Sequence, residues 1–163
     1  MAKTQAHIRY RNKNNEIIPG VTAVLNAVLA KPALLDWAYN CGLQGIDYRA
    51  VRDQAGDVGT IAHGMIMSRF TGEKFDESEY SPNDIDKAEN SLIKYWDWEK
   101  GKTVKPILVE TPLVSELYQY GGTIDCLAEV NGELTLIDFK TGKAIYPEMF
   151  YQVAAYSQLL LEN

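Results

Sequence analysis

The sequence predicts a single α/β (α+β) domain in which a small, mostly antiparallel sheet is flanked by helices. Its 163 residues, of which 46% are hydrophobic and 23% charged, suffice for one hydrophobic core and are too few for two ordinary domains. The spacing of apolar residues is typical of helices before Gly101 and of strands from Val104 to Lys140. Within the strand region, Asn131-Gly132 is the strongest short signal for an antiparallel hairpin.

Helix boundaries follow from capping residues and prolines. Thr22 can cap a short helix, and Pro32, Pro82 and Pro147 each stand where the first turn of a helix tolerates proline. Gly72 follows the end of another helical stretch. The expected elements are a hairpin within residues 1–19 with arms at 7–11 and 16–18, helices at 22–28, 32–40 and 58–70, a solvated loop at 73–81, a helix from 82, strands at 104–114, 121–130 and 133–140, and a helix from 147.

Charge and cysteine content exclude several functional classes. With 16 Lys+Arg against 22 Asp+Glu, the net charge of −6 argues against a protein that coats nucleic acid electrostatically. The two cysteines, Cys41 and Cys126, have no CxxC spacing, so we expect no zinc ribbon, iron–sulfur cluster or disulfide framework. The sequence contains neither an apolar run of about 20 residues nor a signal peptide, and we expect a cytoplasmic protein without a membrane partner.

The Asn131-Gly132 turn sets the register of the predicted hairpin. If Val130 faces Glu133, then Asp125 faces Asp138, with Cβ atoms roughly 4.5–5.5 Å apart. Lys140 projects from the same face. The opposite face is predicted to pack on the core and carries Ile124, Cys126, Ala128, Val130, Thr135, Ile137 and Phe139.

Two facing carboxylates repel each other, so something must offset their charge. A shared proton, a cationic side chain or a bridging divalent metal would each do so. With Lys140, the Asp125–Asp138 pair is suited to holding a hard cation beside a group that orients or deprotonates water. The alternative is a solvated hairpin end with a surface Asp–Lys pair.

Short motifs in a fixed order resemble the RecB-like branch of the PD-(D/E)XK nuclease superfamily, which includes phage and mitochondrial exonucleases. The resemblance covers about residues 20–160 and implies a restriction-endonuclease-like core. The segments that carry it are Gly59-Thr60-Ile61-Ala62-His63, Glu110, Gly122-Thr123-Ile124-Asp125, Ile137-Asp138-Phe139-Lys140-Thr141-Gly142 and Gln152-Val153-Ala154-Ala155-Tyr156.

The resemblance implies a role for each matching residue. His63, Asp125 and Asp138 would bind the metal, Mg²⁺ or Mn²⁺, together with the backbone carbonyl of Phe139. Lys140 would position or activate the attacking water. The remaining matches are Glu110, an acidic residue that would reach the metal through water, and the substrate contacts Gln152, Tyr156, Thr141 and Thr60.

The same residues also allow interpretations without chemistry. His63 would then be a core histidine, Glu110 a surface strand residue, and Gln152 and Tyr156 part of an amphipathic helix. The tryptophans Trp37, Trp96 and Trp98 are either packing residues or platforms for single-stranded bases, and the cations Lys31, Arg49, Arg52 and Lys143 are either a phosphate track or a solvated surface.

We therefore expect a divalent-metal-dependent deoxyribonuclease of phage type, an exonuclease on DNA ends or single strands, with a recombination or replication protein as a partner. The rivals are a catalytically inactive nuclease-fold module that binds nucleic acid or protein, and a nuclease directed at RNA. Relatives of this type continue beyond the last helix, so the apolar ending at Leu159, Leu160 and Leu161 indicates a truncated chain or a minimal version.

Overall fold

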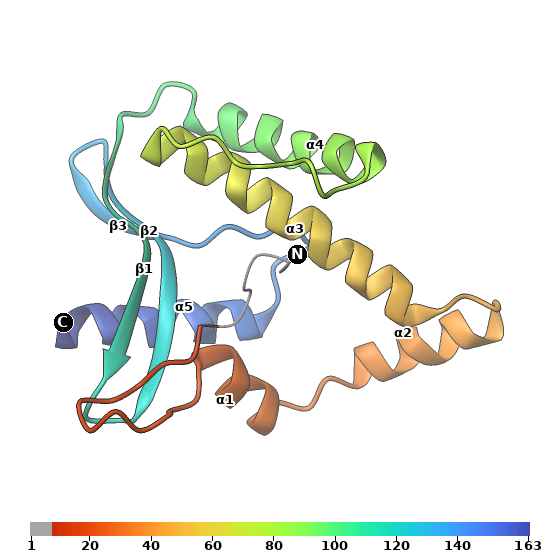
Figure 1. Ribbon diagram of the computed structural model, residues 1–163, viewed down its shortest axis with the longest axis horizontal. Coiled ribbons are helices and arrows are strands. Elements are labelled where there is room, and N and C mark those ends of the chain that lie inside the picture. Colours follow the sequence, from red (N-terminus) through yellow and green to blue (C-terminus); the bar gives the residue numbers. More distant parts are fainter. Residues whose placement is uncertain (1–7) are drawn as a thin grey trace.

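The computed structural model describes residues 8–163, which contain five helices and one three-stranded antiparallel sheet (Figure 1). The chain therefore has the mixed α/β composition that the sequence predicts. The elements are α1 (Val21–Val28), α2 (Pro32–Leu43), α3 (Tyr48–Thr71), α4 (Pro82–Glu99), β1 (Val104–Ser115), β2 (Tyr120–Val130), β3 (Glu133–Ile137) and α5 (Pro147–Glu162).

The sheet has the order β1-β2-β3, and the β2–β3 register is the predicted one. The pairs run from Val130 opposite Glu133 to Cys126 opposite Ile137. Asn131 and Gly132 have φ values of 52° and 90°, the positive values that a type I′ turn requires. The local turn therefore determines which strand residues face each other.

The strand β3 is shorter than predicted, because it ends at Ile137 rather than Lys140. The expected ladder partnership between Asp125 and Asp138 is therefore wrong. Beyond Ile137, the backbone N–H of Phe139 donates to the side chain of Asp125 at 2.7 Å. This side-chain acceptor takes the place of the next backbone pairing.

The N-terminal segment covers part of the edge of β2 with which β3 does not pair. Gly20 forms a parallel bridge with Gly121, whose N–H donates to the carbonyl of Pro19 at 2.9 Å. Ahead of this bridge, an antiparallel bridge between Arg11 and Ile17 closes the expected Asn-rich turn. His7, the first residue of the predicted arm, lies outside the described residues.

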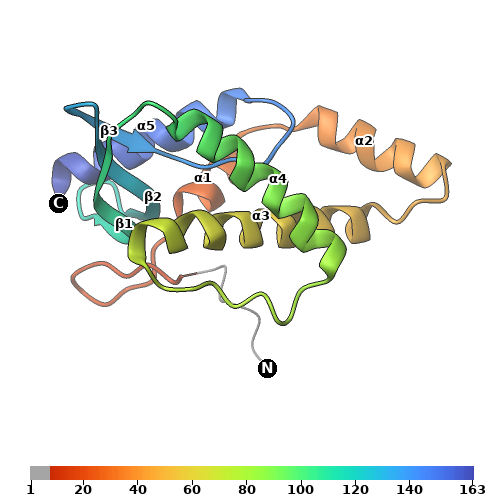
Figure 2. The ribbon, with the colours of Figure 1, turned by 90° about the horizontal axis from the view of Figure 1, so that it is seen from above.

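Helices cover both faces of the sheet (Figure 2), with α1 and α5 on one side and α3 and α4 on the other. On the α5 side, Ile124 is fully buried with Tyr156 and Leu159. On the α4 side, Val109 and Phe139 pack against a cluster that contains Tyr95. Both faces of the strands that carry the predicted site are therefore supported by apolar packing.

Two helix starts differ from the prediction. The helix α3 begins at Tyr48, not Val58, and Asp47 caps it by accepting the N–H of Arg49 at 2.9 Å. Most of its first turns are exposed, so they have no apolar period to detect. The N-cap of α1 is Gly20 rather than Thr22.

The predicted starts at Pro32, Pro82 and Pro147 are confirmed, as is the end of α3 before Gly72, whose φ is 76°.

Within residues 8–163, no single helix has the length and apolar composition of a membrane span. The bent pair α1 and α2 has them only when both helices are counted together.

Candidate functional site

His63 lies at the centre of a group of acidic side chains brought together by α3, β1 and β2. Its Nε2 atom lies 2.9 Å from Oδ2 of Asp125, and its Nδ1 atom lies 3.1 Å from Oε1 of Glu110. The edge of the imidazole contacts the ring of Phe139, with centroids 5.9 Å apart. Both ring nitrogens are therefore used, and the ring is fixed in orientation.

Asp125 links the site to the chain that follows β3. Its side chain is only 13% exposed. One oxygen, Oδ2, interacts with both the His63 ring and the backbone N–H of Phe139. Asp125 thus orients the imidazole and also holds the segment that carries Asp138 and Lys140.

Glu110 reaches His63 through an unusual backbone conformation. It lies on β1 between Val109, which pairs with Cys126, and Thr111, which pairs with Ile124, so it stands opposite Asp125. Its φ is 47°, in the left-handed region that a non-glycine residue adopts at a cost. The half-exposed carboxylate of Glu110 still meets the imidazole.

The ligand atoms of His63, Glu110 and Asp125 all lie within 4.8 Å of one another, as a shared metal ion would require. Without a metal, burial lowers the pKa of His63, but hydrogen bonds to Asp125 and Glu110 and the charges of both carboxylates outweigh burial and raise it to about 10. The site therefore holds one positive charge, the imidazolium, between two negative ones.

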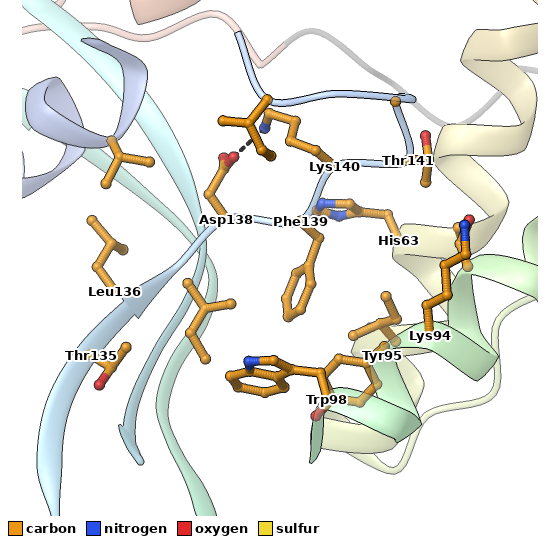
Figure 3. Close-up of a pocket in the computed structure, with 17 residues that line it drawn as sticks. His63, Lys94, Tyr95, Trp98, Thr135, Leu136, Asp138, Phe139, Lys140 and Thr141 are labelled. Carbon is orange, nitrogen blue, oxygen red and sulfur yellow. Dashed lines mark ion pairs between the residues drawn. The ribbon is translucent and has the colours of Figure 1, made fainter. Parts of the chain in front are cut away.

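Asp138 and Lys140 form an ion pair beside this group (Figure 3). The Asp138 side chain is 5% exposed, and its buried Oδ1 atom has no hydrogen-bond partner among residues 8–163. Burial raises the pKa of Asp138, the charge of Asp125 adds to this, and Lys140 opposes it. A buried carboxylate oxygen without a partner is an available ligand for a cation.

Gln152 and Tyr156 brace the far side of β2. The side-chain amide of Gln152 donates to the Tyr156 hydroxyl at 2.8 Å, and the ring lies against Gly122. Burial raises the pKa of Tyr156 to about 12, and the charges of Asp125 and Asp138 contribute. The hydroxyl therefore stays protonated beside the acidic group.

The two threonines predicted to contact substrate differ in position. Thr60 donates to the carbonyl of Gly56 at 3.0 Å, within its own helix, and forms no hydrogen bond to the acidic group in the described part of the chain. Thr141 is exposed, follows Lys140 and faces Gly59 on α3.

The structure thus groups the predicted residues in two sets. The first contains His63, Glu110 and Asp125; the second contains Asp138 and Lys140. Glu110, which was expected to reach a metal through water, contacts the His63 ring directly.

A cavity of about 550 Å³ adjoins both sets, and sequence reasoning missed it. Its lining includes Ser91, Lys94 and Trp98 from α4. The amphipathic period of α4 was visible in the sequence, but the sequence did not show which segment its polar edge faces across the cavity.

No protein-family model matches the chain, and no curated protein matches it.

Proposed function

We propose that this chain is a divalent-metal-dependent deoxyribonuclease that hydrolyses DNA phosphodiester bonds, acting as an exonuclease on ends or single strands. The observation that carries the proposal is the convergence of His63, Glu110 and Asp125 beside the Asp138–Lys140 pair. A histidine, acidic groups and a lysine at one point supply metal ligands and a group that can act on water.

The donor set fits a hard divalent cation. Two carboxylates and one imidazole suit Mg²⁺ or Mn²⁺, and the imidazole favours Mn²⁺ modestly. The partnerless Oδ1 of Asp138 is a further available oxygen. A metal bound here would act as a Lewis acid on the scissile phosphate and lower the pKa of a water ligand.

The residues of the chain perform the remaining tasks. Asp138 holds the Lys140 ammonium in place, where Lys140 orients the attacking water and offsets charge on the phosphate. Asp125 fixes the His63 ring and, through the Phe139 N–H, the segment that carries Lys140. Gln152 and Tyr156 brace β2 from the opposite side.

The arrangement of helices on both sides of the sheet supports a restriction-endonuclease-like core as the fold proposed for this function. The same proposal includes a cytoplasmic location, DNA as substrate and a recombination or replication protein as partner. These three rest on the resemblance of the motifs to those of RecB-like nucleases.

The test is cleavage of end-labelled DNA in Mg²⁺ or Mn²⁺, with EDTA as the metal-removal control. We expect cleavage by the wild type and a loss of at least about 100-fold in Asp125→Asn, Asp138→Ala and Lys140→Ala. The matched control is Lys87→Ala, since Lys87 is an exposed lysine that pairs with Asp84 and does not line the cavity beside the site.

Cleavage that survives both Asp138→Ala and Lys140→Ala would refute the assignment of the site. Cleavage of RNA but not of DNA with the same sequence would identify the RNA-directed alternative. Nucleic-acid or protein binding without hydrolysis of either substrate would favour the inactive module.

A further inference from the structure

The cavity beside the site has two different ends. Its upper end in Figure 3 is bordered by Asp138, Lys140 and Thr141, with His63 just below them. Its lower end is bordered by aromatic rings, among them Trp98. Such a combination of an apolar wall with a few polar groups is typical of a small-molecule pocket.

The aromatic end is built from α4 and the segment after β3. Tyr95 packs edge-to-face on Phe139, with centroids 5.5 Å apart, and lies 5.8 Å from the ring of Trp98. Lys102 covers part of the Trp98 ring at 4.9 Å from its centroid. Trp98 nevertheless remains 38% exposed, so the rings form a supported wall with accessible surface.

Trp98 also offers a hydrogen-bond donor to the cavity. Its indole nitrogen is directed across the cavity towards β3 (Figure 3), and no atom of residues 8–163 accepts a hydrogen bond from it. A heterocyclic base has ring nitrogens and carbonyl oxygens that accept such a bond, as well as a face that stacks on aromatic side chains.

A cation completes the lining. Lys94 lies one helical turn before Trp98 on α4, borders the cavity and forms no ion pair within the described part of the chain. Its ammonium group is therefore available to an anionic ligand. An aromatic wall, an indole donor and an unpaired ammonium together match a base joined to a phosphate.

We propose that this cavity holds a single nucleotide, the terminal residue of a DNA strand or the nucleoside monophosphate released from it. The base lies against Trp98, and Lys94 contacts its phosphate at the end bordered by His63 and Lys140. This inference rests on the proposed nuclease function. A pocket that receives one base beside the reacting phosphate would favour the end of a strand.

The test is calorimetric titration in EDTA, so that binding is measured without metal or turnover. The probes are 2′-deoxyadenosine 5′-monophosphate (dAMP), 2′-deoxyadenosine and inorganic phosphate. We expect dAMP to bind most tightly. Trp98→Ala weakens dAMP binding roughly 5- to 150-fold, the range that loss of base stacking on an aromatic side chain produces.

Matched variants come from the same helix. Trp96→Ala removes an exposed tryptophan that does not line the cavity and leaves dAMP binding unchanged. Lys94→Ala lowers the affinity for dAMP towards that for deoxyadenosine, whereas Lys87→Ala, outside the cavity, does not. Trp98→Phe keeps a ring without the N–H and gives an intermediate affinity, and thermal unfolding checks that each variant is folded.

Two results overturn the nucleotide site: dAMP that binds no more tightly than inorganic phosphate, or equal effects of Trp98→Ala and Trp96→Ala. Cleavage of DNA by a protein that fails these titrations would leave the nuclease proposal standing without the pocket. If the protein binds dAMP in a Trp98-dependent way but cleaves no nucleic acid, the nucleotide site is supported and the nuclease function is rejected.

Discussion

Glu110 and Asp125 stand opposite each other on β1 and β2, and their carboxylates contact the two ring nitrogens of the same imidazole, His63. Like charges at facing positions of a sheet destabilise it. Here they are separated by a histidine whose pKa is raised to about 10, so the pair encloses a cation even without metal. The sheet itself thus positions two ligands, and α3 supplies the third.

The left-handed conformation of Glu110 should cost stability. Comparing Glu110→Gly with Glu110→Ala isolates this cost, because both variants lack the carboxylate and only glycine adopts a φ of 47° readily. We expect the glycine variant to have a free energy of unfolding about 1 kcal/mol higher than the alanine variant. Urea denaturation in EDTA measures the difference, and equal stabilities would contradict strain at this position.

His63 should make the stability of the metal-free protein depend on pH. A histidine in an unfolded chain titrates near pH 6.5, whereas the folded pKa is about 10. The stabilisation is therefore complete below about pH 6.5 and disappears as pH rises through about 10. Urea unfolding in EDTA at about pH 6.5 and about pH 9.5 should show a larger fall for wild type than for His63→Gln. Equal falls in the two proteins would exclude the raised pKa.

Removal of Lys140 should leave a buried charge without its partner. The Asp138 side chain is 5% exposed and its ion pair is with Lys140, so Lys140→Met should destabilise the metal-free protein by about 1–3 kcal/mol. The double variant Lys140→Met/Asp138→Asn should recover most of this loss, because the neutral amide needs no counter-charge. Chemical denaturation of the wild type, both single variants and the double variant gives the coupling free energy between Lys140 and Asp138. If the effects of the two single substitutions simply add, the two side chains do not form an isolated buried pair.

Gly122 should not tolerate a side chain. A Cβ atom there would lie 2.6 Å from a ring carbon of Tyr156 and 3.1 Å from Leu159. We expect Gly122→Ala to cost about 1–3 kcal/mol through overpacking. Gly42→Ala in α2 is the control, because its Cβ would meet no atom of residues 8–163 within 4 Å and alanine favours the helix. Thermal unfolding compares the two, and similar melting temperatures would contradict the tight packing of Tyr156.

Local signals made much of the fold predictable. The Asn131-Gly132 turn made the β2–β3 register predictable because asparagine and glycine tolerate the positive φ values that a type I′ turn requires. The end of β3 was not predictable, because the Phe139 N–H bonds to the distant Asp125 side chain. The first turns of α3 escaped detection because their exposed residues have no apolar period.

The candidate site was predictable in composition and less so in grouping. His63 and Asp125 do meet, but Asp138 pairs with Lys140 instead of completing the His63–Asp125 group, and Glu110 contacts His63 directly. The reason lies in the backbone: a positive φ at Glu110 and the irregular chain after Ile137 redirect these carboxylates. Neither feature follows from alternation along a strand.

The bridge between Gly20 and Gly121 joins the N-terminal segment to the strand that carries Asp125. A hydrogen bond between Tyr10 and Thr123, which are 113 positions apart in the chain, reinforces this junction. Contacts so distant in sequence form slowly, because a large loop must close first. The β2–β3 hairpin pairs strands that are adjacent in the sequence, whereas this edge of β2 pairs with the N-terminal segment, which is far away in the sequence. The Gly121 N–H donates to the carbonyl of Pro19, so amide hydrogen exchange at Gly121 reports how readily the N-terminal segment opens from the strand that carries Asp125.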